Sequence, residues 1–147
     1  MTTRTARTAW NGGLMDGSGQ VEFSSSKVGT FDVSFPKRAA DDADGTTSPE
    51  EMVAGAHSAC YAMSLSKLIA DAGGTPQALD VTADVTLDKD PAGGFRISTI
   101  KLTVRGEVDG LDDAAFQDAA TKAKAGCIIS KALAGVEEIS LDAALES

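Results

Sequence analysis

One stretch decides the fold of this chain: SPEEMVAGAHSAC, which runs from Ser48 to Cys60. Ser48 suits the N-cap of a helix, Pro49 suits its first helical position, and Glu51 completes a capping box. The helix is predicted to run to about Ala72, where two glycines follow. Its many small residues would let another backbone approach closely, so we expect a central helix packed against a second one.

An apolar face is predicted along this helix by residues spaced about three or four apart. Its members are Met52, Val53, Ala56, Ala59, Cys60, Met63 and Ile69.

Strand and helix patterns flank the central helix on both sides. Alternating apolar residues predict short strands before it, including one through Phe31, Val33 and Phe35. The elements predicted after it are a long hairpin over 79–89 and 95–108 with a bulge near Ser98, a second helix over 112–126, a short helix through Leu133 and a last strand over 139–145. This order predicts an α+β fold, not a parallel βαβ wind, in a single domain spanning 1–147.

Charge and hydropathy exclude several classes of partner. The net charge of −9 disfavours nucleic acid and anionic membrane surfaces, which attract Lys and Arg. No apolar run approaches the roughly 20 residues of a membrane span. The first residues contain no apolar core of a secretory signal, so we expect a cytoplasmic protein.

Two cysteines, Cys60 and Cys127, are the candidate reactive groups. The cytosol is reducing, so a structural disulfide is not expected there. The two cysteines and the single His57 are too few ligands for a four-ligand zinc site without carboxylates. Two interpretations stay open: buried thiols that only pack, or a redox pair. Cys127 follows a glycine at a predicted helix start, where a thiolate is favoured. His57 lies three residues before Cys60 and is either a packed histidine or a base for the thiol.

Arg38 and Glu50 are the candidate charged groups of a site. Arg38 can stabilise a thiolate or a peroxide oxygen, or it can simply pair with the acidic loop that follows it. Glu51 is assigned to the capping box, so Glu50 is the freer of the two to hold an arginine. Glu50 lies roughly 15 Å along the helix from Cys60 of its own chain. We therefore hypothesise that the Glu50 serving one Cys60 comes from a second subunit.

Three motifs resemble the OsmC/Ohr family of bacterial hydroperoxide reductases, most closely its OsmC branch. They are SPEEMVAGAHSAC (48–60), VTADVTLDK (81–89) and KAKAGC (122–127), and the likeness spans nearly the whole chain. The family's helix start is Asn-Pro-Glu, where this chain has Ser48. Ile128 follows the second cysteine, where relatives often have proline. The resemblance implies an intertwined homodimer, in which two six-stranded antiparallel-rich sheets enclose central helices and the active sites lie at the subunit interface.

The resemblance also implies a role for each candidate residue. Cys60 would be the peroxidatic cysteine and Cys127 the resolving one, with Arg38, held by Glu50, stabilising the Cys60 thiolate. The implied activity is reduction of organic hydroperoxides, more weakly of hydrogen peroxide, through a Cys60 sulfenic acid and a Cys60–Cys127 disulfide. An external dithiol of the lipoyl type would restore the thiols. No cofactor or metal is expected, because sulfur carries the electrons.

Two rivals keep the same fold with another function. A non-enzymatic stress or ligand-binding protein would not need Cys60. A redox sensor would use the disulfide as a signal, with fast oxidation and poor turnover.

Overall fold

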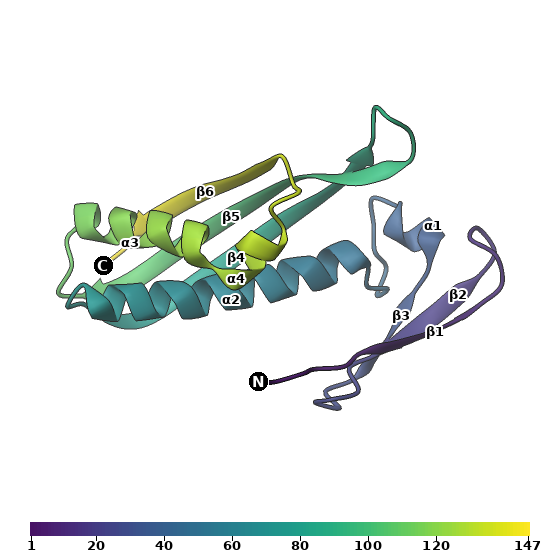
Figure 1. Cartoon of the computed structure of the whole chain (residues 1–147), viewed down its shortest axis with the longest axis horizontal. Helices are drawn as coiled ribbons and strands as arrows, with labels where there is room; N and C mark the ends of the chain where they lie inside the picture. Colours follow the sequence, from purple (N-terminus) through teal and green to yellow (C-terminus); the bar gives the residue numbers. More distant parts are fainter. The chain divides into compact units, whose positions relative to one another are not determined.

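The structure is a computed structural model that describes residues 1–147 and contains six strands and four helices (Figure 1). The chain divides into two compact units, Met1–Met52 and Val53–Ser147, which are described separately. The single domain stays a prediction. None of the helices combines the length and the apolar character that crossing a membrane requires.

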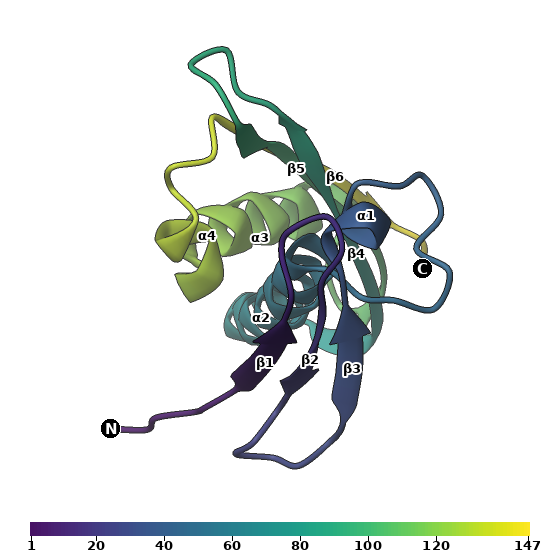
Figure 2. The ribbon, with the colours of Figure 1, turned by 90° about the vertical axis from the view of Figure 1, so that its right-hand side faces the viewer.

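The first unit contains a three-stranded antiparallel sheet in the order β1-β2-β3 (Figure 2). Its strands are β1 (Arg7–Asn11), β2 (Ser18–Glu22) and β3 (Thr30–Val33). Phe23 and Phe31 pack edge to face, with ring centroids 5.9 Å apart. This sheet ends two residues before the helical segment that carries Arg38.

The prediction that the third strand includes Phe35 was wrong. Phe35 begins a short helix, α1 (Phe35–Arg38). Ser34 is its N-cap, since the hydroxyl oxygen accepts from the Lys37 amide at 3.4 Å, and Pro36 fits the first turn, where no amide hydrogen is needed. The cap and the proline together override the alternating pattern and place Arg38 at the end of a helical turn.

The central helix, α2 (Pro49–Asp71), begins where the sequence predicts. The Ser48 hydroxyl oxygen accepts from the Glu51 amide at 3.1 Å, as an N-cap does. The other half of the predicted capping box is not formed. The Glu51 carboxylate accepts from the Thr47 hydroxyl at 2.6 Å, and not from the Ser48 amide. Glu51 is therefore occupied by Thr47 and not by the cap, while Glu50 pairs with Arg38.

The buried face of α2 is rotated from the predicted one. Ala56, Ala59 and Met63, which were assigned to it, are exposed. The buried residues recur every fourth position and are His57, Tyr61, Leu65 and Ile69. These side chains bury more apolar area than a run of small residues can, and hydrophobic stabilisation grows with buried area. The small residues are therefore left on an uncovered face.

The second unit contains a three-stranded sheet in the order β4-β5-β6. Its strands are β4 (Thr75–Lys89), β5 (Phe95–Asp109) and β6 (Glu138–Leu145). β4 and β5 form the predicted hairpin, and the predicted bulge is present, because Ser98 is skipped between the pairs Thr86–Thr99 and Leu87–Ile97. β6 pairs with β5 in parallel, so the α+β fold contains one parallel crossover.

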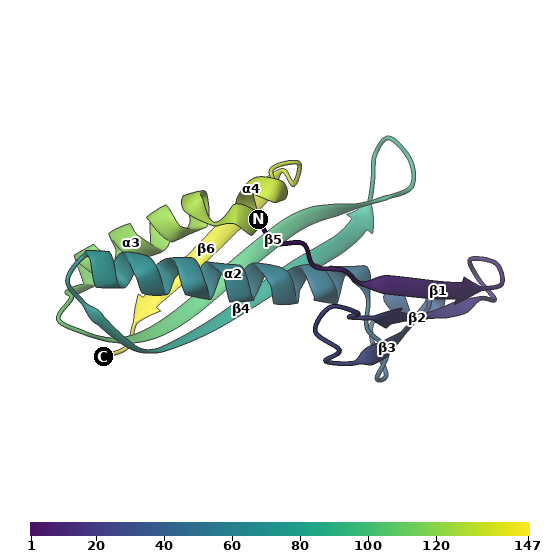
Figure 3. The same ribbon diagram turned by 60° about the horizontal axis from the view of Figure 1, so that its bottom comes forward.

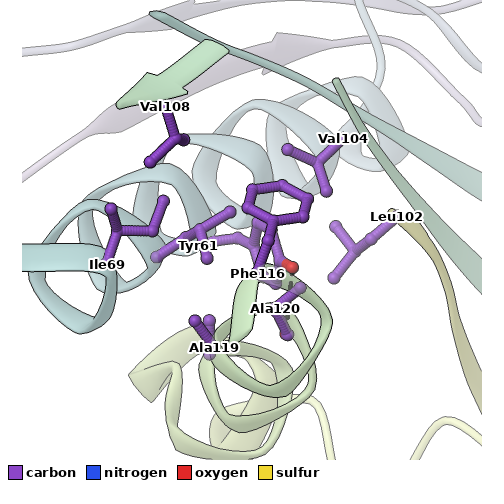
Figure 4. Close-up of a cluster of buried hydrophobic side chains, with 10 residues drawn as sticks. Tyr61, Ile69, Leu102, Val104, Val108, Phe116, Ala119 and Ala120 are labelled. Carbon is purple, nitrogen blue, oxygen red and sulfur yellow. Dashed lines mark hydrogen bonds between the residues drawn. The ribbon is translucent and has the colours of Figure 1, made fainter. Parts of the chain in front are cut away.

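Helices cover one face of this sheet (Figure 3). The crossover from β5 to β6 passes through α3 (Asp113–Gly126) and α4 (Ile128–Ala132). The predicted apolar stripe of α3 is buried in full: Phe116, Ala119, Ala120 and Ala123. Together with α2 and β5 these residues form the core (Figure 4). A second helix does pack against α2, on the face that carries Tyr61.

Two close contacts fix the geometry of the core. The Tyr61 hydroxyl donates to the Ala120 carbonyl oxygen at 3.0 Å, which ties α2 to α3 (Figure 4). Gly106 of β5 lies beneath the Phe116 ring, where a Cβ would come within 2.8 Å of the ring carbon Cε2. Only glycine lets the ring approach the strand so closely.

Candidate active site

The two cysteines of the second unit lie at the meeting point of α2, α3 and α4. Cys127 is the single residue between α3 and α4, with φ −57° and ψ 128°, and it is fully buried. The short helix predicted after it is present, ending at Ala132, one residue before the predicted Leu133. Cys60 lies on α2 and is partly exposed, and both thiols are free. Cys60 is therefore the sulfur that a solute can reach.

The surroundings of Cys60 favour its thiolate. Burial raises its pKa, but hydrogen bonds outweigh that effect, so the pKa of the thiol is lowered overall. The donors are the Cys127 thiol, the backbone amides of Ile129 and Ile128, and the Ser64 hydroxyl. A thiolate is the nucleophilic form of cysteine. The structure thus brings the two predicted cysteines together, and the hydrogen bonds to Cys60 favour its ionised form.

An open groove lies beside this pair. It has a volume of about 240 Å³ and is lined by Ser64, Lys67, Leu68, Lys122, Ala123 and Gly126. Ser64 donates to Cys60, and Gly126 directly precedes Cys127. Lys67 and Lys122 are each paired with an aspartate one turn away on their own helix. The groove is therefore adjacent to the two cysteines, and both lysines that line it are paired.

Arg38 and Glu50 form an ion pair within the first unit. Arg38 Nη2 donates to Glu50 Oε1 at 2.6 Å, and Nε lies 3.0 and 3.1 Å from the two carboxylate oxygens. The Glu50 side chain is 9% exposed and that of Arg38 is 33% exposed. The alternative that Arg38 pairs with the acidic loop is wrong. The forked contact holds the guanidinium in one orientation and leaves part of it open to solvent.

This pair keeps both groups charged. The hydrogen bonds that Arg38 donates to Glu50 raise the pKa of Arg38 above its already high value. Burial raises the pKa of Glu50, but the hydrogen bonds and charge of Arg38 outweigh it, so the pKa of Glu50 is lowered. A fixed cation of this kind can stabilise a thiolate or an oxygen that gains negative charge.

His57 and Ser130 form a buried contact next to the cysteines. His57 Nε2 lies 2.7 Å from the Ser130 hydroxyl oxygen, and the histidine is fully buried. Burial lowers the pKa of His57, so the ring is neutral at neutral pH. Sequence reasoning did not single out Ser130. Its spacing of three residues from Cys127, which matches that of His57 from Cys60, is the signal that could have found it.

The acidic and sulfur side chains do not gather as metal ligands. No group of three His, Cys, Asp or Glu residues could hold a metal ion.

Comparisons with known proteins show the family of the chain. A model of the OsmC family, described as "OsmC-like protein", matches residues 41–142. The chain is 40% identical over 138 residues to "Peroxiredoxin OsmC" of Escherichia coli (strain K12), covering 94% of this chain and 93% of that one. It is 32% identical over 123 residues to "Organic hydroperoxide resistance protein OhrA" of Bacillus subtilis (strain 168), covering 82% and 84%.

A solved structure shows the same fold. The crystal structure of the organic hydroperoxide resistance protein OhrB of Bacillus subtilis matches with a TM-score of 0.71 and 26% identity, over 95% of this chain and 98% of that chain. The family model, the relatives and the fold confirm the resemblance that the three motifs predicted. The chain belongs to the OsmC family.

Proposed function

We propose that the protein is a thiol-dependent peroxidase that reduces organic hydroperoxides, and hydrogen peroxide more weakly. The observation that carries the proposal is the pairing of a partly exposed Cys60, whose pKa is lowered, with a buried Cys127 that donates to it. The names of the relatives, a peroxiredoxin and two organic hydroperoxide resistance proteins, support this chemistry.

In the first step Cys60 attacks the peroxide. The thiolate sulfur bonds to the terminal peroxide oxygen, the O–O bond breaks, and the leaving alkoxide takes a proton to become an alcohol. Sulfur gives up the two electrons that reduce the peroxide, so Cys60 becomes a sulfenic acid. The amide and hydroxyl donors around Cys60 support this step, because they stabilise its reactive form.

In the second step Cys127 resolves the sulfenic acid. Its sulfur attacks that of Cys60, the S–S bond forms, the S–O bond breaks, and the hydroxide leaves as water with the thiol proton. An external dithiol then exchanges with the disulfide, becomes a disulfide itself and restores both thiols. Cys60 is the more accessible sulfur, so it is the expected point of attack. We propose that this reductant is a dithiol of the lipoyl type. We also propose that the protein acts in the cytoplasm, because that compartment keeps dithiols reduced.

Arg38 is proposed to stabilise the charge at the reacting sulfur and peroxide oxygen, with Glu50 fixing its orientation. The forked hydrogen bonds and the low exposure of Glu50 support this role. The proposal predicts that Arg38 lowers the barrier of the first step and has no effect on the second.

A homodimer is part of the proposal. Each sheet of the chain has three strands, so a six-stranded sheet requires a second chain. Gly55, Ala56 and Ala59 lie on the exposed face of α2, and a Cβ at Gly55 would meet no atom within 4 Å. Small uncovered residues of this kind allow a second helix to approach. A fully active monomer would contradict this part of the proposal.

Exposed apolar side chains favour an organic peroxide over hydrogen peroxide. Met63 and Ile128, which lie close in sequence to the two cysteines, are 73% and 75% exposed. An alkyl group packed on them would gain hydrophobic stabilisation that hydrogen peroxide cannot.

Steady-state turnover tests the proposed function. Wild type should reduce tert-butyl hydroperoxide with dihydrolipoamide at a higher kcat/KM than hydrogen peroxide. Cys60→Ser should abolish turnover of both, and Ser58→Ala, a change on the same helix whose hydroxyl bonds only to the Gly55 carbonyl, should not. Fast oxidation of wild type without turnover would favour a redox sensor, and full activity of Cys60→Ser would rule the proposal out.

A further inference from the structure

A buried hydrogen bond joins α2, which carries Cys60, to α4, which follows Cys127. His57 on α2 is 0% exposed and Ser130 on α4 is 8% exposed, and their side chains meet at 2.7 Å. Each residue lies three positions from a cysteine, which is about one helical turn: His57 from Cys60, and Ser130 from Cys127. The contact therefore lies beside the thiol pair and outside the reaction itself.

The helix α4 is too short to fix its own position. It has five residues, and a helix so short is not stable on its own. Cys127 at its N-cap makes no side-chain capping hydrogen bond. Ser130 is its one buried residue, while Ile128 is 75% exposed. The bond to His57 is thus the side-chain hydrogen bond that joins α4 to α2, beside the amide hydrogen bonds of Ile128 and Ile129 to Cys60.

The position of α4 controls two features of the site. Cys127 directly precedes the helix, and the amides of Ile128 and Ile129 donate to Cys60. A shift of α4 would move the resolving sulfur and both amide donors away from Cys60 together. We infer that His57 and Ser130 are positioning residues, whose hydrogen bond holds Cys127 in reach of the Cys60 sulfenic acid. The inference rests on the proposed function.

The contact itself argues against His57 as the base for the thiol. Its Nε2 is occupied by Ser130, and its Nδ1 is buried without a hydrogen-bond partner. The favoured tautomer carries the proton on Nε2, which donates to the Ser130 hydroxyl oxygen, because an unpaired N–H costs more to bury than a lone pair. In this tautomer Nδ1 is the basic nitrogen, and no hydrogen bond joins it to the Cys60 thiol, so the contact of the ring is with α4.

Rapid-mixing kinetics with one equivalent of tert-butyl hydroperoxide separate the two steps. Loss of thiolate reports attack, and formation of the Cys60–Cys127 disulfide reports resolution. Ser130→Ala and His57→Met should each slow resolution by about tenfold, the effect of losing one hydrogen bond of about 1.4 kcal/mol. Both should raise the share of Cys60 that excess peroxide converts to sulfinic acid, a readout that simple loss of stability would not change.

Conservative variants and a matched control complete the test. Ser130→Thr and His57→Gln keep a hydroxyl or an N–H at similar reach and should resolve within about threefold of wild type. Ser58→Ala should match wild type. If either Ser130→Ala or His57→Met does not fold, the other variant decides, together with its conservative counterpart. A wild-type resolution rate in a folded Ser130→Ala or His57→Met variant would overturn the inference. A wild type that forms no Cys60–Cys127 disulfide would instead overturn the proposed function.

Discussion

Replacing Glu50 with Gln removes the charge that holds Arg38 while keeping the size of the side chain. The pair has three donor–acceptor contacts between 2.6 and 3.1 Å, and Glu50 is 9% exposed. Breaking a fully buried pair costs about 3–5 kcal/mol. Arg38 is 33% exposed, so water can solvate the released guanidinium and reduce that cost. We expect a loss of about 1–2 kcal/mol of unfolding free energy, or about 3–6 °C in Tm.

The same change should affect catalysis more than stability. A released Arg38 samples many orientations, and losing one charge-assisted hydrogen bond of about 1.5–3 kcal/mol in the transition state corresponds to about 10- to 100-fold in rate. The assay is the second-order rate constant of Cys60 oxidation by tert-butyl hydroperoxide, beside thermal unfolding. Glu51→Gln is the matched control, because that neighbour is exposed and contacts Thr47.

Acid provides an independent check on the Glu50 reasoning. The pKa of Glu50 is lower in the folded chain than its ordinary value of 4.5, so its contribution to stability is present above that value and is lost as pH falls through the folded pKa. The difference in stability between wild type and Glu50→Gln should therefore shrink in acid. The reasoning is refuted if Glu50→Gln matches Glu51→Gln in both rate and Tm.

Three further changes test the packing and the thiolate. Ser64→Ala removes a donor to Cys60, so the pKa of Cys60 should rise and its alkylation by iodoacetamide should require higher pH; an unchanged profile would contradict the assigned contact. Gly106→Ala would force a Cβ to within 2.8 Å of the Phe116 ring and should cost about 1–3 kcal/mol of unfolding free energy in urea titration. Tyr61→Phe removes a buried hydrogen bond to α3 and should cost about 1 kcal/mol in the same assay, so a neutral result would show that the bond adds nothing.

Local signals in the sequence predicted much of the fold. The N-cap at Ser48 and the proline after it place the start of α2 correctly, because capping depends on neighbouring residues alone. The phase slip near Ser98 predicted the bulge, since side chains alternate strictly along a strand. The sequence also identified both cysteines as candidate reactive groups, but only the family motifs predicted that they lie close together.

Tertiary packing decided what the sequence could not. The run of small residues on α2 suggested a buried face through Ala56 and Ala59, yet the larger Tyr61 and Leu65 occupy the core. The apolar spacing along α2 is compatible with two buried faces, and packing against the neighbouring elements decides which of them is buried. The bond between His57 and Ser130 spans 73 residues, and the matching three-residue spacings from the two cysteines are its one sign in the sequence. The parallel pairing of β6 likewise depends on how the crossover helices pack.

The most direct test of the central claim is to identify the oxidised cysteines after one equivalent of tert-butyl hydroperoxide. Peptide mapping by mass spectrometry under non-reducing conditions should find a Cys60–Cys127 disulfide in wild type. Cys127→Ser should stop at a Cys60 sulfenic acid that dimedone traps, and Cys60→Ser should leave the peroxide unreacted. Consumption of peroxide by Cys60→Ser at the wild-type rate, or a wild-type product oxidised only at Cys127, would contradict the account.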